Sequence, residues 1–297
     1  MPRIVVVGPI GRDLMLRIEA LPDAGGSAPV ERRRELLGGK GANQAVACRQ
    51  LGATTALVGV VGDDDPGRSV LAQAEADGID VTHVVQRHGA STALLVDVLQ
   101  PDGIHRLLED IDPATGLTAD EVSAGADIIR RADAVLIPLQ QTESAILRAL
   151  AIAPPAALVV ADGAPANNRV RDAVLGRADV LRADSREVRS YLGDSDDVPR
   201  LIAAARTMLT AQARLFAFGI SGGDAVVWQD GEIVLRHAPG SVDPTGAGDS
   251  FVAALTVGLL TGVGERTAAE WASAAAGETA AREGARPDLD LDRLRGA

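Results

Sequence analysis

Short apolar runs alternate with segments of helical spacing along most of the 297-residue chain, and this alternation constrains the fold more than any other feature. The first run, Ile4–Val7, ends at Gly8. Further strand-like runs lie at Thr55–Val61, Val135–Ile137, Ala157–Val160, Val180–Leu181 and Leu215–Phe218. Helical spacing is found at Gly41–Leu51, Gly67–Asp77, Ser144–Ala151 and Val198–Leu209. Such alternation predicts an α/β fold with a doubly wound, mostly parallel sheet that carries helices on both faces.

Two stretches break the alternation. Leu14–Leu37 contains extended segments but little helical pattern. Ser91–Glu109 reads as a hairpin with its turn at Gln100-Pro101-Asp102-Gly103. We expect these strands to form a small antiparallel flap over the site. Because no repeat or low-complexity linker divides the chain, residues 1–297 are expected to form a single domain.

Composition excludes some classes of partner. The net charge is −12, from 41 acidic and 29 basic residues, which argues against a nucleic-acid partner, because affinity for that backbone comes from clustered Lys and Arg. Cys48 is the only cysteine, so a disulfide framework is impossible within the chain and a cytoplasmic location is expected. No segment approaches the ~20 apolar residues of a membrane helix, so no membrane partner is expected.

The strongest motif is Asp243–Phe251 (DPTGAGDSF), which precedes the apolar periodic run Val252–Leu260. Small residues at the start of a helix let backbone N–H groups approach a ligand, and the helix N-terminus adds positive potential, so the motif predicts an anion hole. Asp249, at its edge, is placed to accept a proton from a hydroxyl group that attacks a bound phosphate. The alternative is that Asp249 only caps the helix.

Two further glycine-rich turns point to a ligand pocket. Gly38–Ala47 (GGKGANQAVA) opens a helix and carries the donors Lys40 and Asn43, which suit a polyhydroxylated ligand. Asp13 follows the first strand, where open α/β sheets bind ligands, and could accept hydrogen bonds from vicinal hydroxyls. Each segment could also be an ordinary turn with solvated side chains. The chain has no Walker loop, and its four histidines show no metal spacing.

Together these motifs resemble the two signatures of the ribokinase-like, or PfkB, family of carbohydrate kinases. The similarity runs from the strand Ile4–Gly8 to Glu283–Pro287. It implies one ribokinase-like domain with a small β-sheet lid, formed by about residues 12–37 and 91–109, and a homodimer that pairs through the lid. The expected activity is transfer of the γ-phosphoryl group of ATP to a primary hydroxyl of a small sugar.

The resemblance also implies roles for individual residues. Asp249 matches the catalytic base, and the anion hole matches Gly246, Ala247 and Gly248. The sugar-binding positions, which include the base, are Gly11, Asp13, Gly39, Lys40, Asn43, Gln140 and Asp249. The ATP-binding positions are Asp184, Gly219, Gly222, Gly248 and Ser273. Asp184 and Glu187 match the Mg²⁺ region. A monovalent-cation site for K⁺, built mainly from backbone, matches Asp243, Thr245, Arg282 and Gly284.

Four positions depart from the family's pattern. Asp184 begins Asp184–Glu187, where the family has Asn-x-x-Glu, which keeps a hard oxygen ligand but removes a donor. Gly11 and Arg12 stand where ribose-specific members carry Asn and a small residue, and Gln140 replaces a sugar-binding Glu. A pocket that gains Arg12 and loses a carboxylate at position 140 favours a more anionic or larger substrate than D-ribose.

Several other activities remain open at this stage. A nucleoside kinase would need an aromatic wall, for which a chain with 2 Trp, 1 Tyr and 3 Phe has few candidates. Kinases for a 2-keto-3-deoxy sugar acid or a sugar phosphate would use Arg12 for the anionic group. A non-catalytic sugar or nucleotide sensor could share the fold, but it would not need a carboxylate beside an anion hole.

Overall fold

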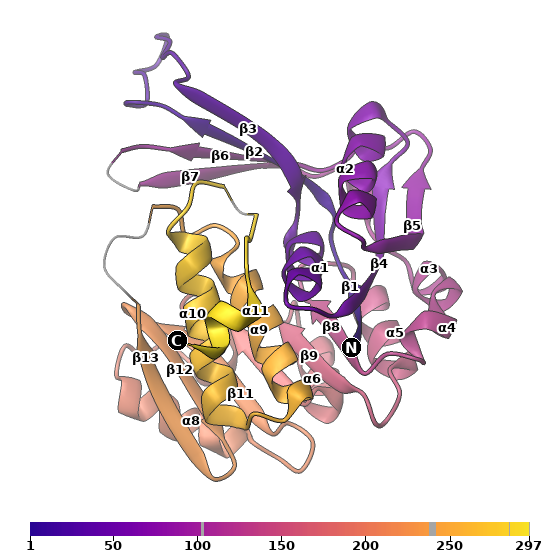
Figure 1. Cartoon of the computed structure of the whole chain (residues 1–297), viewed down its shortest axis with the longest axis vertical. Coiled ribbons are helices and arrows are strands. Elements are labelled where there is room, and N and C mark those ends of the chain that lie inside the picture. The colour runs from indigo at the N-terminus through magenta and orange to yellow at the C-terminus, as the bar shows by residue number, and fades with distance from the viewer. Residues whose placement is uncertain (102–103, 238–241, 285, 297) are drawn as a thin grey trace.

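A large, mostly parallel sheet forms the centre of the molecule (Figure 1). The structure, a computed structural model, describes residues 1–101, 104–237, 242–284 and 286–296. In these ranges the sheet has the strand order β13-β12-β11-β10-β9-β8-β1-β4-β5. Its strands are β1 (Arg3–Val7), β4 (Thr54–Gly62), β5 (Asp80–Arg87), β8 (Ala134–Pro138), β9 (Leu158–Asp162), β10 (Val180–Ala183), β11 (Leu215–Ile220), β12 (Gly223–Trp228) and β13 (Gly231–Arg236). The pairings from β5 to β11 are parallel, and β12 and β13 are added antiparallel.

Helices cover both faces of this sheet. They are α1 (Lys40–Gln50), α2 (Asp65–Ala76), α3 (Ala119–Ala124), α4 (Ala126–Ile129), α5 (Glu143–Ile152), α6 (Asn168–Arg177), α7 (Arg189–Leu192), α8 (Val198–Met208), α9 (Ala247–Thr261), α10 (Glu265–Ala280) and α11 (Leu291–Arg295), with a 3₁₀ turn η1 (Pro113–Thr115). Among the described residues, no helix has the length and apolar character needed to cross a bilayer.

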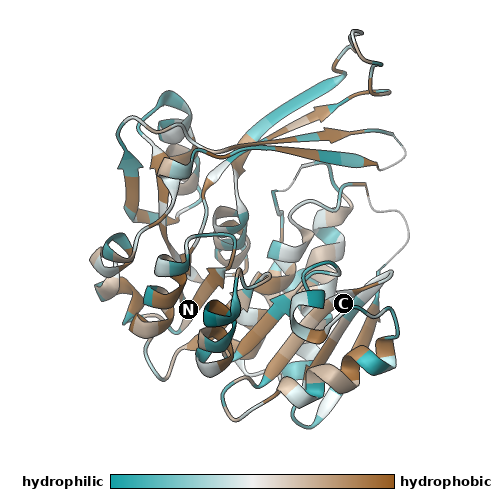
Figure 2. Cartoon of the chain, turned by 180° about the vertical axis from the view of Figure 1, so that it is seen from behind, coloured by the Kyte–Doolittle hydropathy of each residue, from teal (hydrophilic) through white to brown (hydrophobic). Residues whose placement is uncertain are grey.

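Alternate side chains of the central strands pack into two separate cores. Ile4 and Val6 belong to a core with α1, α9 and α10, whereas Val5 and Val7 belong to a core with α5, α6 and α8. A strand with both faces buried reads as a continuous apolar run, and Figure 2 shows the strands of the large sheet mostly in the hydrophobic colour. The expected doubly wound α/β fold is therefore confirmed.

A second, smaller sheet projects from the body (Figure 1). We call it the lid sheet, and its order is β3-β2-β6-β7. Its strands are β2 (Gly11–Arg17), β3 (Arg32–Gly38), β6 (Leu94–Leu99) and β7 (His105–Asp110). The expectation of a purely antiparallel flap is wrong, because β2 and β6 pair in parallel. β2 follows β1 in the chain, and β6 follows β5. Because β1 and β5 run in the same direction in the large sheet, the chain leaves both at the same edge of that sheet, and β2 and β6 also run in the same direction.

Among the contacts that tie the lid sheet to the body, two involve the C-terminal part of the chain. Arg32 Nη1 donates to Glu283 Oε2 at 2.7 Å, and Arg17 also pairs with Glu283. Thr245 Oγ1 donates to Asp97 Oδ2 of β6 at 3.0 Å. Asp102 and Gly103 of the expected turn, and Ala285, two residues after Glu283, lie outside the described residues.

The expected strands and helices are present, and glycine contacts explain how closely they pack. Gly41, at the start of α1, lies so close to the end of β1 that a Cβ there would be 2.8 Å from both the Gly8 carbonyl carbon and the Pro9 oxygen. Gly219 and Ile220 continue β11 beyond its expected end, because they pair with Asp224 and Gly223 of β12. Gly78, with φ of 77°, occupies the left-handed position expected just after α2.

Replacing Gly41 by Ala tests the close packing of α1 on β1. We expect Gly41→Ala to lower the free energy of unfolding by about 1–3 kcal/mol, because the backbone at Gly8 and Pro9 must move. Gly176→Ala, in α6, is the matched control. Apart from its chain neighbours and its own helix backbone, its Cβ would meet no described atom within 4 Å, so helix propensity alone should stabilise the protein by up to ~1 kcal/mol. Urea unfolding compares the two variants, and equal stability would contradict the packing argument.

Candidate functional site

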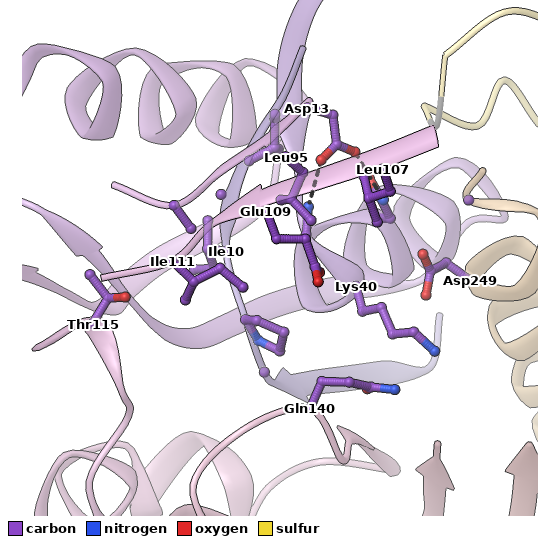
Figure 3. Close-up of a pocket in the computed structure, with 18 of the residues that line it drawn as sticks. Ile10, Asp13, Lys40, Leu95, Leu107, Glu109, Ile111, Thr115, Gln140 and Asp249 are labelled. Atoms are coloured by element: carbon purple, nitrogen blue, oxygen red, sulfur yellow. Dashed lines mark hydrogen bonds between the residues drawn. The ribbon is translucent and has the colours of Figure 1, made fainter. Parts of the chain in front are cut away.

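A cavity of about 620 Å³ lies between the lid sheet and the carboxyl ends of the central strands. The predicted site residues that line it are Gly11, Asp13, Gly39, Lys40, Asn43, Gln140, Thr245, Gly246, Asp249 and Gly284. The predicted site residues that do not line it are Asp184, Glu187, Gly219, Gly222, Asp243, Ala247, Gly248, Ser273 and Arg282. Figure 3 shows that one end of the cavity holds Lys40, Gln140 and Asp249 and the other holds Ile10, Ile111 and Thr115. The cavity therefore has a polar end and a more apolar end.

Gly38 and Gly39, which begin the Gly38–Ala47 motif, make room for Asp13. A Cβ at Gly38 would lie 2.0 Å from Asp13 Cγ, and Gly39 adopts φ of +83°, which L side chains rarely adopt. Gly39 N then donates to Asp13 Oδ1 at 3.4 Å, and Asn43 Nδ2 donates to Asp13 Oδ2 at 3.5 Å. Burial raises the pKa of Asp13 to about 6, although the bonds from Asn43 and Gly39 act in the opposite direction. Asp13 thus presents its carboxyl group to the cavity (Figure 3).

A chain of buried polar groups connects Asp249 to Lys40. Gln44 Nε2 donates to Asp249 Oδ1 at 3.1 Å and to Asp162 Oδ2 at 2.9 Å. Lys40 Nζ donates to the same oxygen of Asp162 at 3.3 Å. Burial raises the pKa of Asp249 to about 7, because the lowering by Lys40 does not outweigh it and the charge of Asp162 raises it further. Asp249 can therefore exchange a proton near neutral pH.

The sequence analysis missed Gln44 and Asp162. Gln44 lies four residues after Lys40 on α1 and therefore on the same helix face, a spacing that could have revealed it. Asp162 ends β9, and residues just beyond parallel strands are the usual place for ligand-binding groups. The sequence analysis also missed Arg182, near the end of β10, whose position at the end of a strand offered the same signal. Arg182 Nη1 donates to Asp162 Oδ1 at 3.2 Å.

The loop before α9 is fixed by Asp243. Its two carboxylate oxygens accept from Thr245 N at 2.9 Å and from Gly284 N at 2.8 Å, and Gly246 turns into the helix with φ of 74°. These bonds hold the start of α9 in place. The predicted monovalent-cation residues Asp243, Thr245 and Gly284 are therefore neighbours, whereas the side chain of Arg282 pairs with Asp288.

The first amides of α9 are available to an anion. Ala247 N donates to Pro244 O at 3.3 Å, whereas the amides of Gly246, Gly248 and Asp249 have no acceptor within the described part of the chain. Free N–H groups and the helix dipole together favour a negative group. The N-cap residue is Gly246, and α9 has no side-chain cap from any described residue, so the alternative that Asp249 only caps the helix is not supported.

Asp184 and Glu187 close a tight turn beyond β10. Asp184 Oδ1 accepts from the amides of Arg186 and Glu187 at 2.7 Å each, and Glu187 Oε2 accepts from Asp184 N at 2.9 Å. Glu187 Oε1 accepts from Gln140 Nε2 at 2.7 Å and lies 3.7 Å from Lys40 Nζ. A Cβ at Gly219 would meet Ser185 N at 2.7 Å, so this turn lies directly against β11.

These oxygens fit Mg²⁺ only in part. In the ranges that the structure describes, no cluster of three or more His, Cys, Asp or Glu residues could enclose a metal ion. Asp184 Oδ2 has no hydrogen bond among those residues. Mg²⁺ keeps several of its waters and needs only one or two protein carboxylates, so the turn suits a hydrated ion.

The remaining predicted residues lie farther from the cavity. Gly222, with φ of 69°, forms the tight turn between β11 and β12, and Ser273 lies in α10.

The expectation that Arg12 adds charge to the pocket is wrong. Its Nη1 pairs with Glu35 Oε1 at 2.8 Å, and Arg12 does not line the cavity. Arg34 and Arg286 line it instead.

Comparison with known proteins assigns the family. Residues 1–291 match the pfkB family of carbohydrate kinases. The chain is 31% identical to the ATP-dependent ribose-1-phosphate kinase of Halopiger xanaduensis, with 99% of this chain and 97% of that protein covered. It is 29% identical to the ribokinase of Bacillus subtilis, with 93% and 92% covered.

The fold comparison agrees with this family. The structure of Arabidopsis thaliana ribokinase with ribose and ATP superimposes with a TM-score of 0.81 at 25% identity, and 99% of this chain and 98% of that chain are covered. The ribokinase structure from Thermotoga maritima has a TM-score of 0.82 at 21% identity, with 100% and 99% covered, which supports the fold. The chain therefore belongs to the pfkB family of carbohydrate kinases and is a phosphotransferase that acts on an alcohol group.

Proposed function

We propose that the protein transfers the γ-phosphoryl group of ATP to a hydroxyl group of a ribose-like sugar, with Asp249 as the catalytic base. The observation that carries this proposal is the placement of Asp249, whose pKa is about 7, beside the free amides at the start of α9 and in the wall of the cavity. The names of the relatives support ATP as donor and ribose or ribose 1-phosphate as acceptor.

The polar end of the cavity holds the sugar in this proposal. Asp13 accepts hydrogen bonds from sugar hydroxyls, while Asn43 and Lys40 donate to them, and the backbone at Gly11 and Gly39 lies against the sugar. Gln140 places a neutral amide where a carboxylate would repel an anionic group of the substrate. The close fit of Gly38 against Asp13 fixes that carboxylate before substrate arrives, which lowers the ordering cost of binding.

Transfer then takes place at the start of α9. The hydroxyl oxygen attacks the γ-phosphorus in line with the leaving β,γ-bridging oxygen, and its proton passes to Asp249. The amides of Gly246 and Gly248 in the Gly246-Ala247-Gly248 segment stabilise negative charge on the transferring group, together with the amide of Asp249. The lid sheet excludes water, so the sugar rather than solvent receives the phosphoryl group.

The nucleotide occupies the side of the site toward β10 and β11. We assign it to Asp184, Gly219, Gly222 and Gly248, with Ser273 near the base. Asp184 and Glu187 would hold a hydrated Mg²⁺, which neutralises charge on the phosphates when bound. A K⁺ ion near Asp243, Thr245, Gly284 and the backbone at Arg282 would order the loop before α9.

The lid sheet is also the proposed dimer contact. Leu107 and Leu108 on its edge strand β7 are 45% and 62% exposed. An exposed edge strand with apolar side chains favours pairing with another chain. We therefore propose a homodimer through the lid sheet, in the cytoplasm.

A sugar phosphate is the second candidate substrate. Arg34 lines the cavity, and its guanidinium has no hydrogen bond or ion pair with any described residue. A free guanidinium suits an anionic substituent on the sugar. The relative named ribose-1-phosphate kinase, at 31% identity over nearly the whole chain, supports the same choice.

Asp249→Asn tests the assignment of the base. We expect kcat to fall ~10²–10⁴-fold with modest change in sugar KM, because the amide cannot accept the proton. ADP release from MgATP across pentoses, hexoses, sugar phosphates and nucleosides measures turnover. Asp292→Asn, an exposed position on α11 with 88% of its side chain accessible, is the matched control. Near-normal kcat in Asp249→Asn would refute this role.

The stability of Asp249→Asn separates a catalytic from a structural defect. The folded pKa of Asp249, about 7, lies above its ordinary value of 3.8, so its ionisation opposes folding as pH rises between these values. At pH 8 this cost is complete, and the amide removes it. The inactive variant should therefore unfold at or above the wild-type temperature at pH 8.

Arg34→Ala distinguishes the two candidate acceptors. If the substrate carries a phosphate at Arg34, the loss of a charge-assisted hydrogen bond should raise KM for ribose 1-phosphate by about tenfold or more, with little effect on ribose. Arg33→Ala is the control, because Arg33 neighbours Arg34 on β3 but does not line the cavity. An equal change for both acceptors would exclude Arg34 as the phosphate ligand.

A further inference from the structure

Arg182 lies directly beneath the first turn of α9. It stands near the carboxyl end of β10, and only 10% of its side chain is exposed. A Cβ on Gly248 would be 2.7 Å from Arg182 Nη2 and 2.9 Å from Nη1, so the guanidinium lies against the Cα of Gly248. Gly248 also carries one of the amides without an acceptor in the described part of the chain. A buried positive charge and unpaired backbone donors therefore meet at one point.

The hydrogen bonds of Arg182 are incomplete. Nη1 donates to Asp162 Oδ1 at 3.2 Å, whereas Nη2 and Nε have no acceptor among the described residues. Asp162 is also shared with Gln44 and Lys40, so it cannot satisfy the whole guanidinium. Nη2, the group nearest Gly248, is therefore available to an acceptor that binds beside that glycine.

A role only as counterion of Asp162 leaves these contacts unexplained. Lys40 already supplies a positive charge to Asp162, at 3.3 Å. The acidic groups around Arg182 are Asp162, Asp224 and Glu187, and each has another partner: His237 for Asp224 and Gln140 for Glu187. A tetrahedral anion held by the amides of Gly248 and Asp249 would provide the acceptors that Nη2 and Nε lack.

We propose that Arg182 is a further catalytic residue that donates to the phosphoryl group during transfer. The inference rests on the proposed function. As the bond from the acceptor oxygen to the γ-phosphorus forms, the bond to the β,γ-bridging oxygen breaks, the hydroxyl proton passes to Asp249, and the bond's electron pair leaves with ADP. Charge on the transferring group is spread over its three equatorial oxygens, and a forked guanidinium beside them stabilises it. Asp162 is the positioning residue that fixes this guanidinium.

Arg182→Ala and Arg182→Lys test the proposal in the full-length protein. We expect kcat of the Ala variant to fall by ~10²–10³-fold, as for loss of a charge-stabilising donor, with partial recovery in the Lys variant. Added guanidinium ion should restore the Ala variant by tenfold or more. Affinity for a non-hydrolysable ATP analogue should fall about tenfold while affinity for ADP stays unchanged, because ADP lacks the γ-phosphoryl group. Arg177→Ala is the control, since Arg177 also pairs with a carboxylate, Asp179, at the other end of β10.

A structural role predicts a different pattern. Arg182→Ala leaves Asp162 with one cation fewer. If that variant does not fold, Arg182→Lys and the double variant Asp162→Asn/Arg182→Met provide the test, because both avoid an unpaired buried charge. Folded variants with kcat within threefold of wild type, or with equal losses of ADP and ATP-analogue affinity and no guanidinium rescue, would overturn the proposal. Absence of wild-type turnover on every acceptor would instead overturn the proposed function, and this inference with it.

Discussion

The buried carboxylate of Asp162 is the interaction on which the site depends. Its side chain is 1% exposed, and it accepts hydrogen bonds from Lys40 and Gln44 of α1 and from Arg182 of β10. Burial alone would raise the pKa of Asp162, but Lys40 and Arg182 outweigh burial and keep the pKa below its ordinary value. Asp162 therefore stays ionised, and the groups around it are held in fixed positions.

Two neighbouring carboxylates consequently have different chemistry. Asp249 shares the Gln44 amide with Asp162 but has no direct ion pair among the described residues, so burial and the charge of Asp162 raise its pKa to about 7. One carboxylate is a permanent anion that orders cations, and the other can take up a proton. Pairs of acidic groups whose pKa values are pushed apart are typical of acid–base sites, and this arrangement underlies the role proposed for Asp249.

The local features of the fold could be predicted from sequence, because they depend on nearby residues. The buried strands, the helices between them and the turn after α2 follow from apolar periodicity and glycine. The parallel pairing of β2 with β6 could not be predicted, since it depends on where two distant strands leave the large sheet.

The same limit applies to the site. Asp13, Lys40, Asn43 and Asp249 lie in motifs of contiguous sequence, and they line one cavity. Asp162 and Arg182 lie far from these motifs in the chain and meet them only in the folded protein, where Asp162 accepts from Lys40 and the Arg182 guanidinium lies beside Gly248. Arg12 shows the opposite error. Its place in the sequence suggested a pocket residue, but its guanidinium pairs with Glu35 on the neighbouring strand β3.

The pH dependence of kcat/KM, for wild type and Asp162→Asn, tests most directly whether Asp249 is the base. The base must be ionised in the free enzyme, so kcat/KM should fall as pH drops through about 7 in the wild type. The negative charge of Asp162 raises the pKa of Asp249. Its removal in Asp162→Asn should therefore lower that pKa and move the acid limb to lower pH. A wild-type kcat/KM that is constant between pH 5 and 8, or an acid limb that stays in place or moves to higher pH in Asp162→Asn, would contradict the account.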